Sequence, residues 1–589
     1  MSPFADILYT NNVPGNSQIS AIRSFLDPLQ SELADKDAEV QRLQSALEAA
    51  TQARDQLRDL ISAHEALLSP MRRIPNDVLG LIFQHTLPER RHTALDPSEG
   101  PLLLMRVCRY WRDLALGTPR LWAAMHVVWA PATIDRLVQQ MKLWFARSCA
   151  VPLDINMYSS RQIPLRQLHP SPPLAGEDRD SDADADAELP NDSPLSVLLS
   201  EARRWRTIRV SVTLPDESTA LNRLSTADVP LLSSFDISMT SAAEEGEHGF
   251  EFLATPSLRR LAFSGAYTVI PPAIQWQNIV VLQLRSYHDS ESGASLGCTF
   301  PFPFLQHCTA LEKLSLTISS DVVMTTHDRV QLPKLTRLSF ASFGDPNGSS
   351  DCSAILHTLD LPSLSTFDLQ FNQATIGIFQ TPCFANIQCL VLPAMLLPTE
   401  DVHAILALLP LLERLRLIGE PIIRREQGLA FPDEEFLRGL VLKDDSDADS
   451  DSDTGKQPPL CPSLRHIEFT SSRAVSDALI LSFILSRTLP AVAHFAGVAE
   501  LTDFNCYCYR EQQLDIRAAP ELADALSRGF RLLLGYEPPV GMQRYTPLEG
   551  TERERATYGV LANHVGDPRE TREAHEWLQD FSADGFLAS

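Results

Sequence analysis

Cys506 and Cys508, separated only by Tyr507, are the only two cysteines that lie close together in the sequence. Two thiolates at this spacing could help to hold zinc if two further cysteine or histidine ligands followed at a suitable distance. The sequence has no second cysteine pair and no histidine at such a spacing. We therefore expect two ordinary thiols here, no metal and no cofactor.

The sequence also lacks the motifs of common catalytic sites. It has no Gly-x-Ser-x-Gly nucleophile elbow, no phosphate-binding Gly-x-x-x-x-Gly-Lys and no dinucleotide-binding Gly-x-Gly-x-x-Gly. Two His-Glu pairs, at residues 64–65 and 575–576, lack the second histidine that a zinc protease helix requires. We therefore expect a protein that binds other molecules and is not an enzyme.

Two acidic segments, residues 172–193 and 443–458, contain aspartates at alternate positions. This spacing is similar to that of a calcium-binding loop, but the glycine turn and the closing glutamate are missing. Both segments are expected to be disordered, because like charges repel and few apolar residues are present. Ser446, Ser450 and Ser452 could accept phosphate from an acid-directed kinase.

A dense apolar pattern lies between residues 74 and 122. Asn76 and Asp77 are residue types that begin helices, and apolar residues follow them at helical spacing. A second apolar helix is predicted to begin near Leu102 and to end at Gly117. Fewer than ~50 residues bury too little apolar surface to be stable alone, so we expect this segment to dock on a partner.

This segment resembles the F-box. The resemblance lies in Ile-Pro-Asn-Asp-Val-Leu-Gly-Leu-Ile-Phe, then Val-Cys-Arg-Tyr-Trp-Arg-Asp-Leu-Ala, then Thr-Pro-Arg-Leu-Trp. It implies binding to the Skp-type adaptor of a cullin ubiquitin ligase. The positions that match the family pattern, and that the resemblance implies for adaptor binding, are Pro75, Leu79, Ile82, Phe83, Val107, Cys108, Trp111 and Trp122. The alternative is a pair of ordinary core helices within a larger domain.

A seven-residue repeat precedes this segment and predicts a coiled coil over residues 22–69. One seam contains Leu26, Leu33, Val40, Leu47, Ile61 and Leu68, and the companion seam contains Leu29, Leu43, Ala50 and Leu57. Lys36, Arg54 and His64 interrupt the seams and could fix register or partner choice. The helix could associate with a second copy or pack back on its own chain.

After the helical segment, the pattern Leu-x-x-Leu-x-Leu, with apolar replacements, recurs ten times. Most intervals lie within or near the ~20–29 residues of leucine-rich repeats. Such units stack into a curved solenoid with a parallel sheet on the concave side. The irregular lengths resemble those in F-box proteins with degenerate leucine-rich repeats. The copies are Trp205/Ile208/Val210, Leu232/Phe235/Ile237, Leu258/Leu261/Phe263, Ile279/Leu282/Leu284, Leu311/Leu314/Leu316, Leu335/Leu338/Phe340, Leu364/Phe367/Leu369, Ile387/Leu390/Leu392, Leu412/Leu415/Leu417 and Leu464/Ile467/Phe469.

The predicted fold class is therefore α/β. The predicted organisation is a disordered N-terminus (1–21), a coiled-coil helix (22–69), an F-box (70–123), a linker helix with a first strand (131–158), an acidic loop (172–193), a leucine-rich-repeat solenoid (194–490) with an acidic insertion (443–458), and a C-terminal cap and tail (491–589). Within the last part, residues 522–534 are expected to form an apolar helix.

Composition limits the remaining classes. A net charge of -25 over 589 residues argues against a protein that binds nucleic acid by neutralising phosphates. No apolar stretch approaches the ~20 residues that cross a bilayer, and residues 1–15 lack the features of a secretory signal. Scattered cysteines suit a reducing compartment, so a cytoplasmic or nuclear location is expected.

Taken together, the resemblance implies the substrate-recognition subunit of an SCF-type ubiquitin ligase, made of Skp adaptor, cullin and F-box protein. The solenoid would then bind a protein target. Basic residues beside the strand leucines, namely Arg337, Arg414, Arg416 and Arg465, suggest an acidic or phosphorylated target segment. The alternative is a non-catalytic interaction scaffold with no role in ubiquitination.

Overall fold

The computed structural model describes residues 2–68, 70–88, 92–129, 134–159, 193–212, 215–239, 249–264, 273–285, 299–300, 304–319, 323–324, 329–343, 356–370, 376–393, 397–418, 433–442, 459–472, 475–488, 497–508 and 510–536. The chain divides into two compact units, Met1–Ile82 and Phe83–Ser589. The division falls within helix α2 (Asn76–His85). The acidic segments 172–192 and 443–458 lie outside the described residues.

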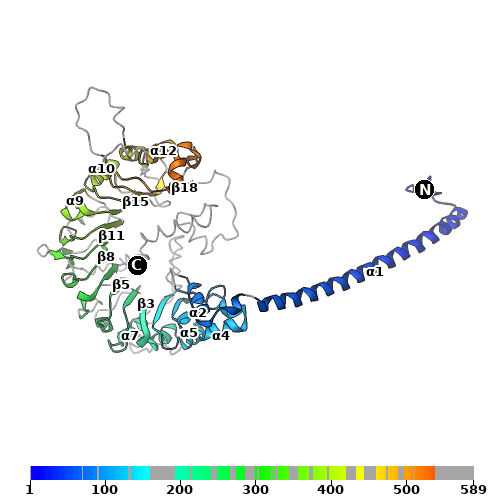
Figure 1. Cartoon of the computed structure of the whole chain (residues 1–589), viewed down its shortest axis with the longest axis horizontal. Helices are drawn as coiled ribbons and strands as arrows, with labels where there is room; N and C mark the ends of the chain where they lie inside the picture. Colours follow the sequence, from blue (N-terminus) through cyan, green and yellow to red (C-terminus); the bar gives the residue numbers. More distant parts are fainter. Residues whose placement is uncertain are drawn as a thin grey trace, which may run out of the picture. The chain divides into compact units, whose positions relative to one another are not determined.

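The first unit is dominated by α1 (Asn16–Leu68), a helix of 53 residues (Figure 1). It begins six residues before the predicted start at residue 22. The residues before it form turns, and the ring of Phe4 packs edge-on against Phe25 with centroids 5.8 Å apart. A short 3-10 helix, Pro70–Arg73, then leads to α2.

The second apolar helix of the 74–122 segment is broken into two, where the sequence predicted one. Helix α3 (Leu104–Val107) ends at Cys108, and α4 (Arg109–Leu116) begins directly after it. Cys108 is fully extended, with φ −159° and ψ 171°, and its sulfur accepts a hydrogen bond from the Trp111 amide at 3.4 Å. The prediction of a continuous helix is wrong because Cys108 acts as a helix cap, a role that cysteine rarely takes.

In the described part of the second unit, fourteen parallel strands form one sheet whose spatial order follows the sequence. The predicted α/β class with a large parallel sheet is thus confirmed. The strands are β1 (Ala124–Trp129), β2 (Leu153–Ser159), β3 (Trp205–Val212), β4 (Ser234–Met239), β5 (Arg260–Ser264), β6 (Val281–Arg285), β8 (Lys313–Ser319), β11 (Arg337–Phe343), β13 (Thr366–Gln370), β14 (Cys389–Pro393), β15 (Arg414–Ile418), β16 (His466–Ser472), β17 (Asp503–Cys508) and β18 (Arg531–Tyr536). Two small parallel pairs join β7 (Thr299–Phe300) to β9 (Val323–Met324) and β10 (Val330–Gln331) to β12 (Leu359–Asp360).

The register of the sheet aligns the predicted repeats. The second motif residues pair across the strands, as Ile208 does with Phe235 and Phe235 with Leu261, and the third residues form a parallel row beside them. All members of these two rows are buried, because alternate side chains of a strand point to the same face. The sheet therefore has one apolar core face and one open face that carries the polar residues between them.

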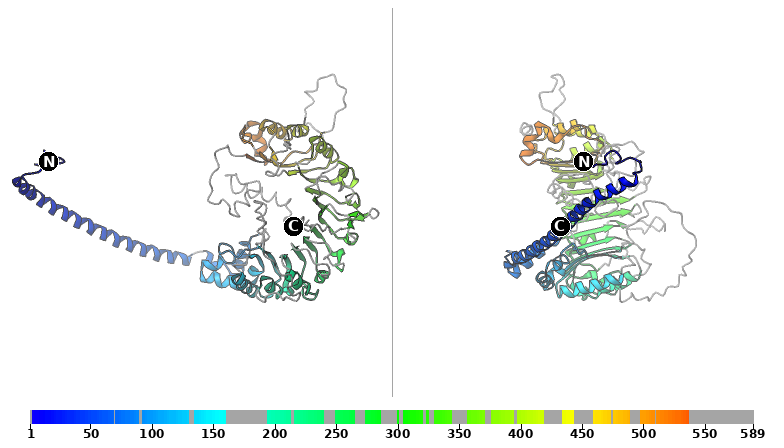
Figure 2. Two further views of the ribbon diagram at one scale, coloured as in Figure 1. Left: turned by 180° about the vertical axis from the view of Figure 1, so that it is seen from behind. Right: turned by 90° about the vertical axis from the view of Figure 1, so that its right-hand side faces the viewer.

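The core face is covered by short helices. These are 3-10 helix η2 (Pro119–Trp122), α5 (Ile134–Ser148), α6 (Pro194–Leu199), α7 (Pro215–Asn222), α9 (Ile376–Phe379), α10 (Thr399–Ala407), α11 (Glu434–Leu440), α12 (Asp477–Ser486) and α13 (Ala523–Ser527). Within the second unit, Figures 1 and 2 show α9, α10 and α12 on the outer side and the strands on the inner side. No helix in the described ranges is long and apolar enough to cross a membrane.

The sheet extends further in both directions than the predicted solenoid of residues 194–490. It starts at Ala124 and ends at Tyr536 within the described residues. The expected helix at residues 522–534 is wrong: α13 ends at Ser527, Gly529 has a φ of +99°, and β18 follows. A positive φ suits glycine and ends a helix, so the apolar residues after it enter the sheet.

Candidate protein-binding surfaces

Helix α2 presents an apolar stripe to solvent. Val78, Leu81 and Ile82, here called the α2 patch, are exposed, with Leu81 at 54% and Ile82 at 38%. Their spacing of three and four residues places them on one side of the helix. Leu79, by contrast, is fully buried. Pro75 is exposed, and its carbonyl accepts the first helical hydrogen bond from the Leu79 amide at 2.9 Å.

The second unit exposes apolar side chains of its own around α3 and α4. Leu103, Val107 and Tyr110, here called the α3–α4 patch, are all exposed, and Val107 reaches 55%. Cys108 is also exposed. Beneath them, the half-buried ring of Trp111 packs on the buried ring of Phe83, with centroids 4.9 Å apart. Single exposed apolar residues are common on proteins, but groups of them mark binding surfaces.

Trp122 has a structural position that the F-box resemblance did not anticipate. Its ring is fully buried, its Nε1 donates to the Ala115 carbonyl at 2.8 Å, and it packs edge-on against Trp144 on α5 at 4.8 Å. Trp205 makes an equivalent bond to the Leu198 carbonyl, also seven residues earlier, at 3.1 Å. Trp122 therefore occupies the first motif position of the β1 repeat, where it joins the helical segment to the sheet.

The predicted adaptor-binding residues thus separate into two groups. Pro75, Ile82, Val107 and Cys108 are exposed, and Trp111 is half-buried. Leu79, Phe83 and Trp122 are fully buried within the chain. Only the first group can contact a partner directly, and of the buried residues Phe83 packs on the half-buried Trp111.

The predicted target-binding residues lie in three different settings, on the open face of the sheet or beside it. Arg337 and Arg414 occupy the same register row, three strands apart, which corresponds to about 14 Å at normal strand spacing. Arg465 is exposed and directly precedes β16. Arg416 lies in the next row, opposite Glu468. The structure therefore does not bring the four arginines into one cluster.

Arg416 contacts Glu468 on the next strand, a pairing that was not predicted from the sequence. Its Nε lies 3.2 Å from Oε2 of Glu468, whose side chain is fully buried. Among the described residues, neither carboxylate oxygen of Glu468 has a hydrogen-bond partner. Burial raises the pKa of Glu468 to about 7, although the charge of Arg416 partly opposes this.

Replacing Glu468 with glutamine is expected to make the protein more stable at pH 8, by up to about 3 kcal/mol. The folded-state pKa of about 7 lies above the ordinary value of 4.5. Between these values the folded state retains a proton that the unfolded state has lost, so the free energy of unfolding falls as pH rises. Chemical unfolding across pH 5–8 should show this decline in the wild type and not in the variant.

The exposed Glu400 on α10 provides a control, since Glu400→Gln should leave the pH dependence unchanged. A Glu468→Gln protein that is less stable than the wild type at pH 8 would show that the ion pair with Arg416 outweighs the cost of burial.

Ion pairs also link the last strands of the open face. Asp503 contacts both His466 on β16 and Arg531 on β18, and it accepts a hydrogen bond from the Thr502 hydroxyl at 2.6 Å. Burial acts to raise the pKa of Asp503, but these partners outweigh it and lower the pKa to about 2. Asp503 therefore balances the basic residues His466 and Arg531 at this end of the sheet.

A second set of ion pairs joins β2, β3 and β4. Arg206 Nε donates to Asp154 at 2.9 Å, Arg209 contacts Asp236 at 2.5 Å, and Arg209 donates to the Tyr158 hydroxyl at 3.2 Å. These ion pairs were not predicted from the sequence, although Arg209 and Asp236 occupy the same position between two motif residues in consecutive repeats. Opposite charges at equivalent repeat positions are a signal that could have revealed this pairing.

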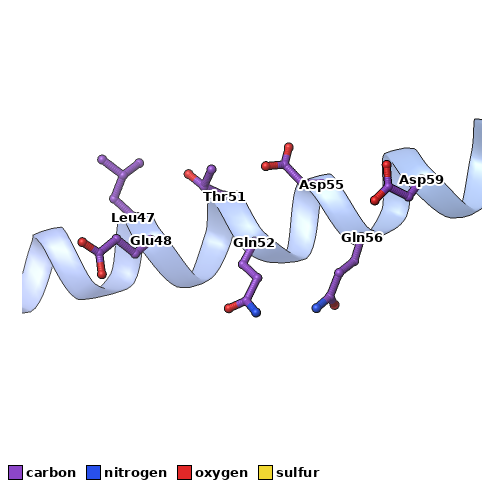
Figure 3. Close-up of a pocket in the computed structure, with 7 residues that line it drawn as sticks. All are labelled: Leu47, Glu48, Thr51, Gln52, Asp55, Gln56 and Asp59. Carbon is purple, nitrogen blue, oxygen red and sulfur yellow. The ribbon is translucent and has the colours of Figure 1, made fainter. Parts of the chain in front are cut away.

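The thiols of Cys506 and Cys508 lie 3.6 Å apart, and both are buried. Within the ranges that the structure covers, no group of three or more histidine, cysteine, aspartate or glutamate side chains is arranged to hold a metal ion. A shallow depression on α1 is lined by Leu47, Glu48, Thr51, Gln52, Asp55, Gln56 and Asp59. All seven lining residues belong to this one helix, as Figure 3 shows.

No family model and no curated protein sequence matches this chain. The two apolar patches and the open face of the sheet are therefore the features from which a function has to be inferred.

Proposed function

We propose that this chain is the substrate-recognition subunit of an SCF-type ubiquitin ligase. Segment 70–123 would bind the Skp-type adaptor and, through it, a cullin, while the open face of the sheet would hold a protein target. The chain would supply no catalytic residue. It would act by raising the effective concentration of target lysines near a ubiquitin-charged enzyme.

The observation that carries this proposal is the exposure of Ile82 and Val107 within the two motif segments that resemble the F-box. Apolar side chains anchored on buried neighbours, such as Phe83 under Trp111, are suited to the core of a protein interface. The long parallel sheet supports the second half of the proposal, because stacked repeats offer an extended surface to one macromolecule.

For the target, we propose an acidic or phosphorylated segment. Arg337 and Arg414 are half-buried in one row of the open face, and Arg465 is exposed beside β16. Guanidinium groups bind carboxylates and phosphates through paired, charge-assisted hydrogen bonds. Arg416 is excluded from this role because Glu468 already engages it.

Changing Ile82 or Val107 to aspartate is expected to weaken adaptor binding by about thirtyfold or more, the effect of losing an interface hot spot. Both side chains are exposed, so neither change should unfold the chain. The full-length protein and a Skp-type adaptor would be co-expressed, and the dissociation constant measured with the purified proteins. Leu143→Asp, at an equally exposed leucine on α5, is the matched control and should bind normally.

Absence of adaptor binding by the wild type, or equal losses in all three variants, would overturn the proposal.

The target surface is tested separately. A variant with both Arg337→Glu and Arg414→Glu should still bind the adaptor. It should no longer bind the target proteins, which are identified as those that accumulate when the gene is deleted. Adaptor binding without any accumulating protein would instead favour the scaffold alternative.

A further inference from the structure

Helix α1 exposes an apolar seam over most of its length, interrupted at Lys36, Arg54 and His64. Its heptad positions a and d include Leu29, Leu33, Val40, Leu43, Leu47, Leu57, Ile61 and Leu68, which are between 46% and 69% exposed. Helices are stabilised mainly by packing an apolar face, and an uncovered seam of this length needs a partner. Polar side chains lie outside the seam, and Figure 3 shows Glu48, Gln52 and Gln56 among them.

The start of the same seam is partly covered by the chain itself. Ile19 and Ile22 are half-buried, and Phe25 is held by Phe4. Pro28 then interrupts the helical hydrogen bonds, since proline has no amide hydrogen. The seam left for a partner therefore runs from Leu29 to Leu68.

A parallel, in-register pairing of two such helices places like charges together. Lys36 would face Lys36 of the second copy, and Arg54 would face Arg54. At the flanking g and e positions, Glu32 would lie beside Asp37 of the second copy. In that arrangement, no pair of flanking g and e positions brings a positive residue beside a negative one.

We propose that α1 binds a second copy of itself as an antiparallel coiled coil in which Leu29 lies opposite Leu68. This register uses the whole free seam. It places Lys36 opposite Ile61 and Arg54 opposite Leu43, so each cationic residue of the seam faces an apolar residue and not another cation. At the flanking e positions it places Asp37 beside Arg58 of the second copy, and symmetry provides this ion pair twice.

Sedimentation of the full-length protein is expected to show a concentration-dependent dimer. Leu47→Asp puts a charge into the middle of the seam and should make the protein monomeric. Ala49→Asp, exposed and outside the seam, is the control and should remain dimeric. A monomeric wild type, or a dimer that survives Leu47→Asp, would overturn the proposal.

Charge reversal determines the orientation. In the antiparallel register, Asp37→Arg faces Arg58 twice and should weaken the dimer about tenfold, as should Arg58→Asp. The double variant should restore the wild-type affinity. In a parallel pair, Asp37→Arg would instead tighten the dimer, because it would face Glu32 of the second copy. The double variant would then not return the dimer to wild-type affinity. Either result would exclude our register. These measurements need no adaptor, and their outcome is independent of the proposed ligase function.

Discussion

Replacing Arg487 with methionine is expected to lower the free energy of unfolding by about 3–5 kcal/mol. The side chain is fully buried and donates to three backbone carbonyls: Leu440 at 2.8 Å, Cys461 at 2.9 Å and Leu460 at 2.6 Å. Methionine fills much of the space but donates no hydrogen bond, so three carbonyls would lose their donor. Burial lowers the pKa of Arg487 to about 10, which still leaves it charged at neutral pH.

Denaturant unfolding followed by circular dichroism would measure this loss, and hydrogen exchange would locate it at residues 433–442 and 459–464. Arg438→Met is the matched control, because Arg438 lies on the surface in an ion pair with Glu434 at 2.6 Å. Exposed pairs contribute about 0–1 kcal/mol. A stability change below about 1 kcal/mol in Arg487→Met would show that the carbonyls find other donors.

Asp477→Asn is expected to cost about 3–4 kcal/mol at pH 7. The buried carboxylate at the start of α12 contacts Arg510 and accepts hydrogen bonds from the Tyr536 hydroxyl at 3.0 Å and from the amides of Gln513 and Leu514 at 2.7 and 2.8 Å. It thereby ties the end of β18 and the segment after β17 to α12. Asparagine keeps the shape but loses the charge and presents a donor to groups that are themselves donors.

The pH dependence provides a second test of Asp477. Burial acts to raise its pKa, but the hydrogen bonds from Arg510, Leu514 and Gln513 outweigh burial and lower it below the ordinary 3.8. Its contribution to stability is therefore complete above pH 3.8 and is lost as pH falls through the lowered pKa. The difference between wild type and variant should shrink in that acidic range. Asp524→Asn, on the surface beside Arg528, should show neither effect.

The sheet was largely predictable because a single pattern repeats. In all ten predicted copies the second and third apolar residues lie in paired, buried rows. A side chain that points into the core of a parallel stack is nearly always that of leucine, isoleucine, valine or phenylalanine. The spacing of apolar residues in the motif therefore remains visible in the sequence.

The strands that were missed have weaker motif residues. In β17 the motif is Leu501/Phe504/Cys506, with a cysteine in the third position, and in β18 Gly529 occupies the first position. In β1 the motif is Trp122/Met125/Val127, and its tryptophan had been assigned to the F-box segment. Cysteine packs as a small apolar residue, so including it in the pattern would have found β17.

The candidate binding surfaces were less predictable than the fold. Spacing identified segment 74–122 as apolar but could not separate exposed Val107 from buried Phe83, because both residue types suit a core and an interface equally. On the open face, Arg416 and Arg414 are two residues apart, yet only the first meets a buried carboxylate. That difference depends on the residue that the next strand places opposite, which is 52 positions further along the chain.

Within the described residues, each strand of the large sheet bonds only to the members of that sheet that precede and follow it in the sequence. The structure is therefore close to one-dimensional, and its stability is approximately a sum of unit and nearest-neighbour contributions. Folding can nucleate in any group of adjacent units and spread outward, without closing a long loop first. For the same reason, loops of different length can join neighbouring units at little energetic cost, which leaves evolution free to vary the spacing of the strands while the stack persists.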